Sequence, residues 1–333
     1  MKEPRVAIAG ATGMVGQEFM RILAQREFPL ASLRLLASER SRGRSFDFRG
    51  ETLPVQVLDD KSFEGIDVAL FSAGGSISTA FAPIAVDAGA VVIDNSNAWR
   101  MEPEVPLVVP EVNPGEAFKH KGIIANPNCS TIQMVVVLDP LHRKWELKRV
   151  VVTTFQSVSG TGKNAVDELK QQIRDIEEGK PATAQVYPHQ IAYNCLPHID
   201  IFLDNGYCRE EQKMIDETRK IMGLPGLPIT ATTVRVPVYV GHGESVNCEF
   251  KKPVEPDEAR EALGQAQGVE VVDDPSKNLY PLAVDCEGQD ASFVGRIRKD
   301  YSAENALNLW VVSDNLRKGA ALNAIQIAEL LLD

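Results

Sequence analysis

The sequence predicts an α/β protein in two parts: a doubly wound, mostly parallel sheet over residues 1–127, followed by an α+β domain over residues 128–314. In the first part, short apolar runs alternate with helix-like segments, which is typical of a parallel sheet covered by helices on both faces. In the second part, longer strand-like runs follow one another and the helices are grouped apart, which indicates a mixed or antiparallel sheet.

The first part begins with a strand, a glycine-rich loop and a helix. "RVAIA" (5–9) reads as a short buried strand, and "MVGQEFMRILAQ" (14–25) has apolar residues at helical spacing. A further helix is expected at about 77–88. The remaining strands are predicted at 33–38, 67–73, 90–94, 107–110 and 122–125.

The second part is expected to contain helices at about 163–178, 208–222 and 256–267, and strands at 148–159, 230–240, 246–252 and 305–314. Residues 180–206 form the least regular segment, and a loop of that length is often functional or interfacial. The last segment, 319–332, is an amphipathic helix expected to return to the first domain. Residues 315–333 are therefore assigned to that domain, which becomes discontinuous.

Composition limits the kind of partner and the compartment. The chain has 333 residues and a formal net charge of -11, so a small-molecule partner is expected and no nucleic acid, because phosphate backbones are bound by basic faces. It lacks an apolar run of the roughly 18 residues that a membrane span needs, and also the apolar core of a signal peptide. A cytoplasmic protein without membrane association is expected. The five cysteines contain no C-x-x-C pair, so neither a disulfide framework nor a metal site is predicted.

The loop "GATGMVG" places Gly10, Gly13 and Gly16 between the first strand and the first helix. Glycines permit a tight turn and close backbone approach, and the helix N-terminus offers free N–H groups to a pyrophosphate. The spacing is G-x-x-G-x-x-G instead of the usual G-x-G-x-x-G, and a strand-to-helix turn without a ligand is the alternative. The context favours a dinucleotide-binding, Rossmann-like domain.

The end of the second predicted strand, "LASERSRGRS", bears on the choice of dinucleotide. An acid at this position would bind the ribose hydroxyls of NAD. Here Ser38, Arg40 and Ser41 offer hydroxyls and a guanidinium group that suit a 2′-phosphate, so NADP is favoured. Glu39 argues in the other direction if its side chain faces the ribose, and a solvated basic turn is the remaining alternative.

Cys129 lies in "NPNCST", between an Asn-Pro-Asn turn and an apolar helical run. A cysteine at a helix N-terminus has its thiolate stabilised by the helix dipole and by unpaired N–H groups. Those N–H groups, together with the Asn128 side chain, would also stabilise an oxyanion on a thioester. A lone cysteine is otherwise a small core residue.

A base and an anion-binding group come from "RVPVYVGHGES". His242 lies between two glycines just past a predicted strand, where reactive groups tend to be presented. Arg235 lies in the mainly apolar run before it, and an arginine there requires an anion. The anion that pairs with Arg235 is either a carboxylate of the protein, in a structural salt bridge, or a carboxylate of the substrate.

Six motifs in this order resemble the aspartate-semialdehyde dehydrogenase family over essentially the whole chain: "GATGMVG", "SNAWRM", "NPNCST", "FQSVSGTG", "RVPVYVGHGES" and "DNLRKGAALNAIQIAELL". The resemblance implies a dinucleotide-binding domain joined to a catalytic and dimerisation domain, a homodimer, and NADP as cofactor. It also implies the reversible, NADPH-dependent conversion of β-aspartyl phosphate to aspartate 4-semialdehyde, in lysine, threonine, methionine and diaminopimelate biosynthesis.

The resemblance implies a role for each matching residue. Cys129 would form the thioester, with Asn128 at its oxygen, His242 would be the general acid/base, and Gln156 would orient the acyl group. Arg235 would pair with the substrate α-carboxylate, and Glu210, or its neighbour Glu211, with the α-amino group. Arg100 and Lys213 would hold phosphate. The implied cofactor contacts, with those of the glycine loop and the basic turn, are Gly10, Thr12, Gly13, Met14, Val15, Ser38, Arg40, Ser41, Ser72, Ala73, Gly74, Ser159, Gly160 and Asn315.

Two alternatives accompany this interpretation. One is another phosphorylating aldehyde dehydrogenase of similar build, such as N-acetyl-glutamyl-phosphate reductase or glyceraldehyde-3-phosphate dehydrogenase. The spacing of Arg235 and His242 and the pair Glu210 and Lys213 favour aspartyl phosphate. The other is a non-catalytic relative, against which both Cys129 and His242 are present.

Overall fold

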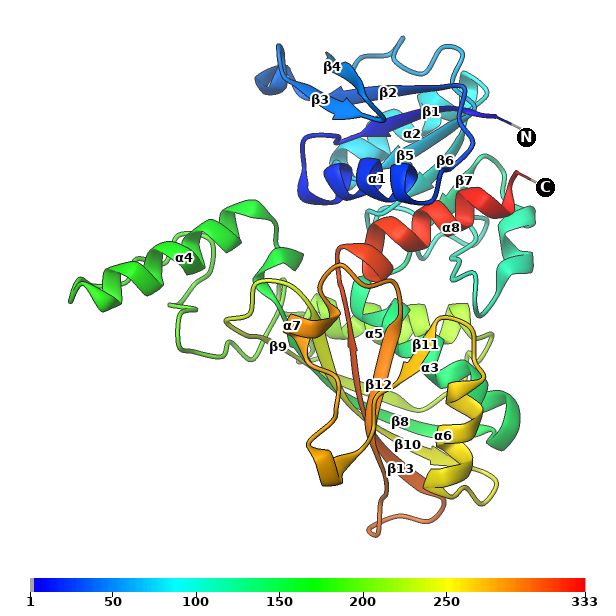
Figure 1. Ribbon diagram of the computed structural model, residues 1–333. Helices are drawn as coiled ribbons and strands as arrows, with labels where there is room; N and C mark the ends of the chain where they lie inside the picture. Colours follow the sequence, from blue (N-terminus) through cyan, green and yellow to red (C-terminus); the bar gives the residue numbers. More distant parts are fainter. Residues whose placement is uncertain (1–2, 333) are drawn as a thin grey trace. The chain divides into compact units, whose positions relative to one another are not determined.

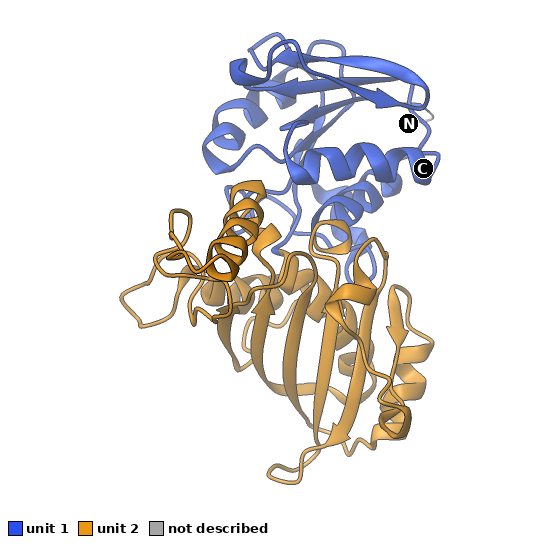
Figure 2. Ribbon diagram, turned by 60° about the vertical axis from the view of Figure 1, so that its left-hand side comes forward, with its two compact units in different colours: residues 1–128, 320–333 blue, residues 129–319 orange. Residues whose placement is uncertain are grey.

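The computed structural model describes residues 3–332, and the chain divides into two compact units (Figure 2). Unit 1 contains residues 1–128 and 320–333, and unit 2 contains residues 129–319. Residues 315–319 therefore belong to unit 2, whereas the sequence assigned them to the first domain. The reason is local packing, because a Cβ atom added to Gly319 would lie 2.9 Å from the Cβ atom of Cys129.

Unit 1 contains a seven-stranded sheet in the order β3-β4-β2-β1-β5-β6-β7 (Figure 1). Neighbouring strands are parallel except for β3 and β4, so the predicted doubly wound sheet is confirmed. The antiparallel edge hairpin was not predicted. The expected strand at 107–110 is wrong, since Leu107 makes only an isolated bridge to Ala125. The strands are β1 (Arg5–Ala9), β2 (Ser32–Ala37), β3 (Ser45–Phe48), β4 (Glu51–Val57), β5 (Val68–Phe71), β6 (Val91–Asp94) and β7 (Ile123–Ala125).

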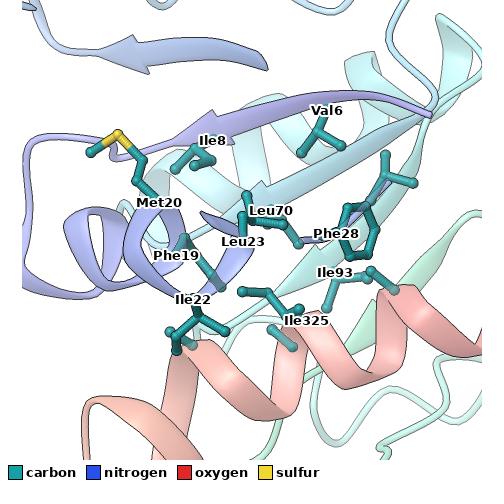
Figure 3. Close-up of a cluster of buried hydrophobic side chains, with 14 of the residues drawn as sticks. Val6, Ile8, Phe19, Met20, Ile22, Leu23, Phe28, Leu70, Ile93 and Ile325 are labelled. Atoms are coloured by element: carbon teal, nitrogen blue, oxygen red, sulfur yellow. The ribbon is translucent and has the colours of Figure 1, made fainter. Parts of the chain in front are cut away.

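The helices α1 (Met14–Gln25) and α8 (Leu322–Leu330) pack together over the apolar core of this sheet. Figure 3 shows Phe19, Ile22 and Leu23 of α1 beside Ile325 of α8. The C-terminal helix thus completes the core of unit 1. The other helical segments of the unit are η1 (Glu39–Ser41), α2 (Gly75–Asp87) and η2 (Pro114–Lys119), and a π-helical turn, η5 (Arg317–Ala321), precedes α8.

Unit 2 contains a six-stranded mixed sheet in the order β11-β12-β13-β10-β8-β9. The long strands and the helices at 163–178, 208–222 and 256–267 were predicted, whereas β11 and β12 were not. The strands are β8 (Leu147–Gln156), β9 (Ile229–Arg235), β10 (His242–Phe250), β11 (Val269–Val271), β12 (Ser292–Lys299) and β13 (Ala306–Ser313). The helical segments are α3 (Cys129–Trp145), η3 (Val158–Gly160), α4 (Lys163–Glu177), α5 (Arg209–Ile221), α6 (Pro256–Gly264), η4 (Pro275–Lys277) and α7 (Ala283–Cys286).

One face of this sheet is the core of unit 2, with α3 packed against β8, β10 and β13. Along β10 the buried positions alternate, so that Val246, Cys248 and Phe250 join Met134 and Val137 of α3 in one apolar cluster. The alternation fixes which side chains of β10 face α3. No helix within residues 3–332 is long and apolar enough to cross a membrane.

Replacing Ile325 by alanine tests whether α8 stabilises unit 1. The Ile325 side chain is fully buried in the core, and such a truncation costs about 2–5 kcal/mol of unfolding free energy. We expect a clear fall in the urea midpoint of I325A. The control F118A removes a side chain of unit 1 that is 63% exposed and should change the midpoint little. Equal midpoints for both variants would contradict this packing.

Candidate active site

Three candidate residues lie close together at the edge of the unit 2 sheet that is formed by the ends of β8 and β9 and the start of β10. Gln156 ends β8 and Arg235 ends β9, and the two are paired in the parallel register. β10 runs antiparallel to β8 with Gly243 opposite Phe155, which brings His242, the first residue of β10, to the same edge. All three side chains are buried. His242 thus begins a strand, where the sequence suggested a position just past one.

The His242 imidazole is fully buried and held through Nδ1. The Ser157 backbone N–H donates to Nδ1 at 3.1 Å, and the Ser157 Oγ lies 3.0 Å from the same nitrogen. A neutral ring that accepts at Nδ1 carries its proton on Nε2. Nε2 has no hydrogen-bond partner within residues 3–332. Burial, and secondly the Arg235 charge, lower the pKa of His242 to about 3.

Asn315 holds the loop that carries Ser157. Its Oδ1 accepts hydrogen bonds from Ser157 Oγ at 3.0 Å, from Ser159 Oγ at 3.2 Å and from the Gly241 backbone N–H at 2.9 Å. This side chain therefore joins the segments on both sides of His242. It was predicted from resemblance as a cofactor contact, and its structural role in positioning Ser157 was not foreseen.

Gly160 leaves room for the Arg235 guanidinium and the His242 imidazole. An added Cβ would lie 3.2 Å from Arg235 Nη1 and 3.3 Å from His242 Nε2, which is tighter than nearly all real Cβ contacts. Only glycine fits here without displacing one of these side chains. Ser159 and Gly160, predicted as cofactor contacts, thus lie next to the imidazole.

The Arg235 guanidinium is held by a backbone carbonyl and lies near an aromatic ring. Nη1 donates to the Ser157 carbonyl at 2.6 Å, and the guanidinium carbon lies 5.9 Å from the centre of the Tyr187 ring. Within the described chain, no salt bridge to Arg235 is found and its Nε has no hydrogen-bond partner. A buried cation in this state favours binding of an external anion over the structural salt bridge.

The Gln156 side chain is hydrogen-bonded to a row of charged groups, two of which are on α5. Its Nε2 donates to Glu210 Oε1 at 3.1 Å, and Lys213 Nζ donates to Glu210 Oε2 at 3.1 Å. Lys213 also binds Asp200 at 3.1 Å. Glu211 instead accepts hydrogen bonds from the Cys208 and Thr233 backbone N–H groups. Of the two neighbouring acids, Glu210 is therefore the one at the Gln156 side chain.

Cys129 is the first residue of α3, partly exposed and outside any disulfide. The close approach of Gly319 described above lets the chain after Asn315 pass directly over it. One turn later on the helix, Gln133 Nε2 donates to the His242 carbonyl at 3.2 Å. Asn128, the last residue of unit 1 before α3, is buried. Neither Gly319 nor Gln133 was found from the sequence, because their importance depends on packing between distant segments.

In unit 1 the glycine loop has the geometry that a pyrophosphate requires. Gly10 has a φ of +93°, and an added Cβ would lie 2.3 Å from the Ser72 carbonyl oxygen. The first helix starts at Met14 after Gly13, which provides no side-chain cap. The N–H groups of the first turn, including that of Val15, are thus available to an anion. Ala73 and Gly74 follow Ser72 and lead into α2.

The turn after β2 has the residues expected for a 2′-phosphate. Ser38 and Arg40 are exposed, and Ser41 Oγ lies 3.2 Å from Thr12 Oγ1 of the glycine loop. Glu39 forms a 2.8 Å ion pair with Arg42. Because Glu39 is paired with Arg42 within this turn, its carboxylate no longer argues against NADP. Together the residues of the glycine loop and this turn fit an NADP molecule.

Arg100 is buried in unit 1, with Nε donating to the Asn126 carbonyl at 3.0 Å and Nη2 to the Asn95 carbonyl at 2.7 Å. These bonds fix the guanidinium by its backbone contacts. Its predicted role at phosphate stays a prediction.

Comparisons with known proteins assign both units to one family. Residues 5–120 match the NAD binding domain of semialdehyde dehydrogenases, and residues 138–318 match their dimerisation domain. Aspartate-semialdehyde dehydrogenase of Aquifex aeolicus is 57% identical over 332 residues, covering 98% of each chain.

Solved structures agree with this family assignment. Aspartate semialdehyde dehydrogenase II from Vibrio cholerae, complexed with ASA, superposes with a TM-score of 0.97 at 47% identity and covers 100% of this chain and 99% of its own. Aspartate semialdehyde dehydrogenase with NADP from Candida albicans has a TM-score of 0.76 at 26% identity, with 99% and 98% covered.

The burial of His242 predicts a loss of stability in acid. Its pKa is about 3 in the folded chain and about 6.5 when unfolded. Below pH 6.5 the unfolded chain therefore binds a proton that the folded chain does not. Stability is lost as the pH falls from 6.5 toward 3, by at most about 1.4 kcal/mol per pH unit.

Urea unfolding of wild type and H242Q between pH 7 and pH 4 measures this effect. We expect the wild type to lose more stability than H242Q over that range. The matched control H189Q replaces an exposed histidine and should follow the wild type. Parallel curves for wild type and H242Q would contradict the buried neutral imidazole.

Proposed function

The chain belongs to the aspartate-semialdehyde dehydrogenase family, and from this premise we propose how its residues perform the reaction. The protein is an NADP-dependent, phosphorylating aldehyde dehydrogenase that interconverts β-aspartyl phosphate and aspartate 4-semialdehyde. The observation that carries the residue assignment is the edge of the unit 2 sheet. There a buried imidazole, a buried glutamine and a buried arginine that forms no salt bridge with any described residue lie together.

Cys129 is the proposed nucleophile. In the biosynthetic direction its thiolate attacks the acyl carbon of β-aspartyl phosphate, a C–S bond forms, and the bond to the phosphate oxygen breaks. Inorganic phosphate leaves and a thioester remains on Cys129. The start of α3 stabilises the thiolate, and the Cys129 N–H and the Asn128 side chain are proposed to bind the thioester oxygen.

His242 is the proposed general acid/base. When bound, NADPH supplies the hydride that converts the thioester to a hemithioacetal. The imidazolium donates its Nε2 proton to the hemithioacetal oxygen and takes it back as the carbonyl re-forms and the C–S bond breaks. Protonation of both ring nitrogens needs an acceptor at Nδ1, and Ser157 Oγ at 3.0 Å can provide it.

Substrate binding would itself prepare His242 for this role. The Arg235 charge is one cause of the low pKa of the imidazole. A substrate α-carboxylate paired with Arg235 would offset that charge and favour the imidazolium. Glu210 is proposed to bind the α-amino group and Gln156 to orient the acyl group. Arg100 and Lys213 are proposed, each from its own position, to bind phosphate.

The residues of unit 1 are proposed to hold NADP. Gly10, Thr12, Gly13, Met14 and Val15 would bind the pyrophosphate, and Ser38, Arg40 and Ser41 the 2′-phosphate. Ser72, Ala73 and Gly74 follow β5, at the carboxyl end of the parallel sheet where dinucleotides bind. In unit 2, Ser159, Gly160 and Asn315 remain proposed cofactor contacts.

A homodimer in the cytoplasm completes the proposal. Residues 138–318 match a dimerisation domain, and Thr153 and Phe155 are only half buried on the sheet face turned away from α3. The described cysteines form no disulfide, which is the usual state of cysteines in cytosolic proteins.

Turnover of aspartate semialdehyde with phosphate and NADP tests the proposed function. We expect activity in the wild type and a loss of roughly a thousandfold or more in C129A, because removal of a nucleophile leaves only residual catalysis. The control C195A removes an exposed cysteine and should retain activity. Full phosphate-dependent turnover in C129A would rule out the nucleophile, and inactivity of the wild type would rule out the substrate.

Replacing Arg235 by lysine tests the carboxylate contact. Lysine keeps the charge but loses the planar fork that binds a carboxylate through two hydrogen bonds. We expect KM for aspartate semialdehyde to rise roughly ten- to a hundredfold. The control R149K changes an arginine at the other end of β8 that pairs with Glu249 and should leave KM unchanged. An unaltered KM in R235K would place the carboxylate elsewhere.

A further inference from the structure

Glu244 is a buried acid that the proposed mechanism does not use. It lies two residues after His242 on β10, on the face that packs against α3. In the register of the sheet it is opposite Thr154 on β8 and Val311 on β13. Its side chain has no solvent exposure. An acid in the apolar core of unit 2 needs a physical explanation.

The surroundings of Glu244 favour a neutral carboxyl group. Within the described residues neither carboxyl oxygen has a hydrogen-bond partner and no cation forms a salt bridge with it. On the adjoining elements, β8 contributes Thr154 and Gln156, β13 contributes Val311, and α3 contributes Gln133, none of which titrates. The titratable side chains closest to these positions along the same elements are His242, two residues before Glu244 on β10, and Cys129, one turn before Gln133 on α3. Burial raises the pKa of Glu244 well above the usual range.

Gln133 connects Glu244 with both reacting side chains. It lies one helical turn after Cys129, so the two share one side of α3. Its Nε2 donates to the His242 carbonyl at 3.2 Å. Its Oε1 is buried and, like both carboxyl oxygens of Glu244, has no hydrogen-bond partner among the described residues. Gln133 is also the side chain that partly opposes the effect of burial on the Glu244 pKa, so the two groups are neighbours. Since Oε1 is an acceptor, a hydrogen bond to Glu244 requires the proton to be on the carboxyl group.

We propose that Glu244 is a positioning residue that acts as a neutral carboxylic acid, donating its O–H to Gln133 Oε1. This bond holds the amide in the orientation in which Nε2 binds the His242 carbonyl. The helix that begins with Cys129 is thereby fixed to the strand that begins with His242. The inference rests on the proposed function, in which these two residues act on one acyl group.

Two substitutions separate this role from simple core filling. E244Q keeps the size and supplies an amide N–H to Gln133 Oε1, so its kcat should stay within about threefold of wild type. E244M keeps the volume but leaves Oε1 unpaired. Its kcat should fall roughly ten- to a hundredfold while KM values change little. Q133M and the double variant Q133M/E244M should show the same loss as E244M, because residues of one hydrogen-bonded unit are not additive.

Two further readouts are specific to the proton. The alkaline limb of the kcat–pH profile should move to higher pH in E244Q, since an amide cannot lose a proton. An infrared difference spectrum of wild type minus E244Q at neutral pH should contain the carbonyl band of a protonated carboxylic acid that shifts in D2O. The spectrum needs no turnover, so its result is independent of the proposed reaction.

Three results would overturn the inference: absence of the protonated-acid band at neutral pH, an equal loss of kcat in E244Q and E244M, or an unchanged kcat in E244M. If E244M does not fold, the infrared spectrum and the E244Q profile still decide. If the wild type lacks activity on aspartate semialdehyde while the band is present, the proposed function fails and the neutral carboxyl group stands.

Discussion

The hydrogen bond from the Ser157 N–H to His242 Nδ1 constrains the whole edge of the unit 2 sheet. It must be made inside the protein, because the imidazole is fully buried. The loop that carries Ser157 is therefore tied down by the Asn315 side chain, which accepts from Ser157 and Gly241 together. Gly160 must lack a side chain so that His242 and Arg235 fit beside it. The need to hold one buried imidazole in place thus explains the identity of several other residues in three segments.

The charges of Arg235 and Glu210 at this edge of the sheet match those of an amino-acid substrate. Arg235 is a buried cation without an anionic partner among the described residues, and it disfavours protonation of His242. Glu210 favours that protonation, while it is itself bound by Gln156 and Lys213. A carboxylate at Arg235 and an amino group at Glu210 match the two ends of an amino acid, and the pairing would link substrate binding to proton transfer.

Much of the fold followed from local patterns. The apolar runs and helical periodicities located the sheet of unit 1 and the long helices of unit 2, because each of those elements has a regular buried face. The edge hairpin β3–β4 and the strand β11 were missed because they have few buried positions. The strand β12 was missed because its pairing register shifts between Gly295 and Arg298, which interrupts the apolar pattern. At the candidate site, Cys129 and His242 were predicted from a helix start and from flanking glycines.

Other features of the site depend on segments that are distant in sequence and could not be read from it. Gly319 packs on Cys129 from near the C-terminus, and Gln133 reaches His242 across the core. The choice of Glu210 over Glu211 also required the structure, because only the structure shows that Glu211 caps its own helix through the Cys208 N–H.

The central claim is that Cys129 binds the acyl group as a thioester, the intermediate between the acyl phosphate and the semialdehyde. Mass spectrometry of the protein incubated with aspartate semialdehyde and NADP in the absence of phosphate tests it most directly. Oxidation of the bound hemithioacetal should leave one aspartyl thioester on the peptide that contains Cys129, and addition of phosphate should remove it. An acyl group on another cysteine, or NADPH formation without any adduct, would contradict the account.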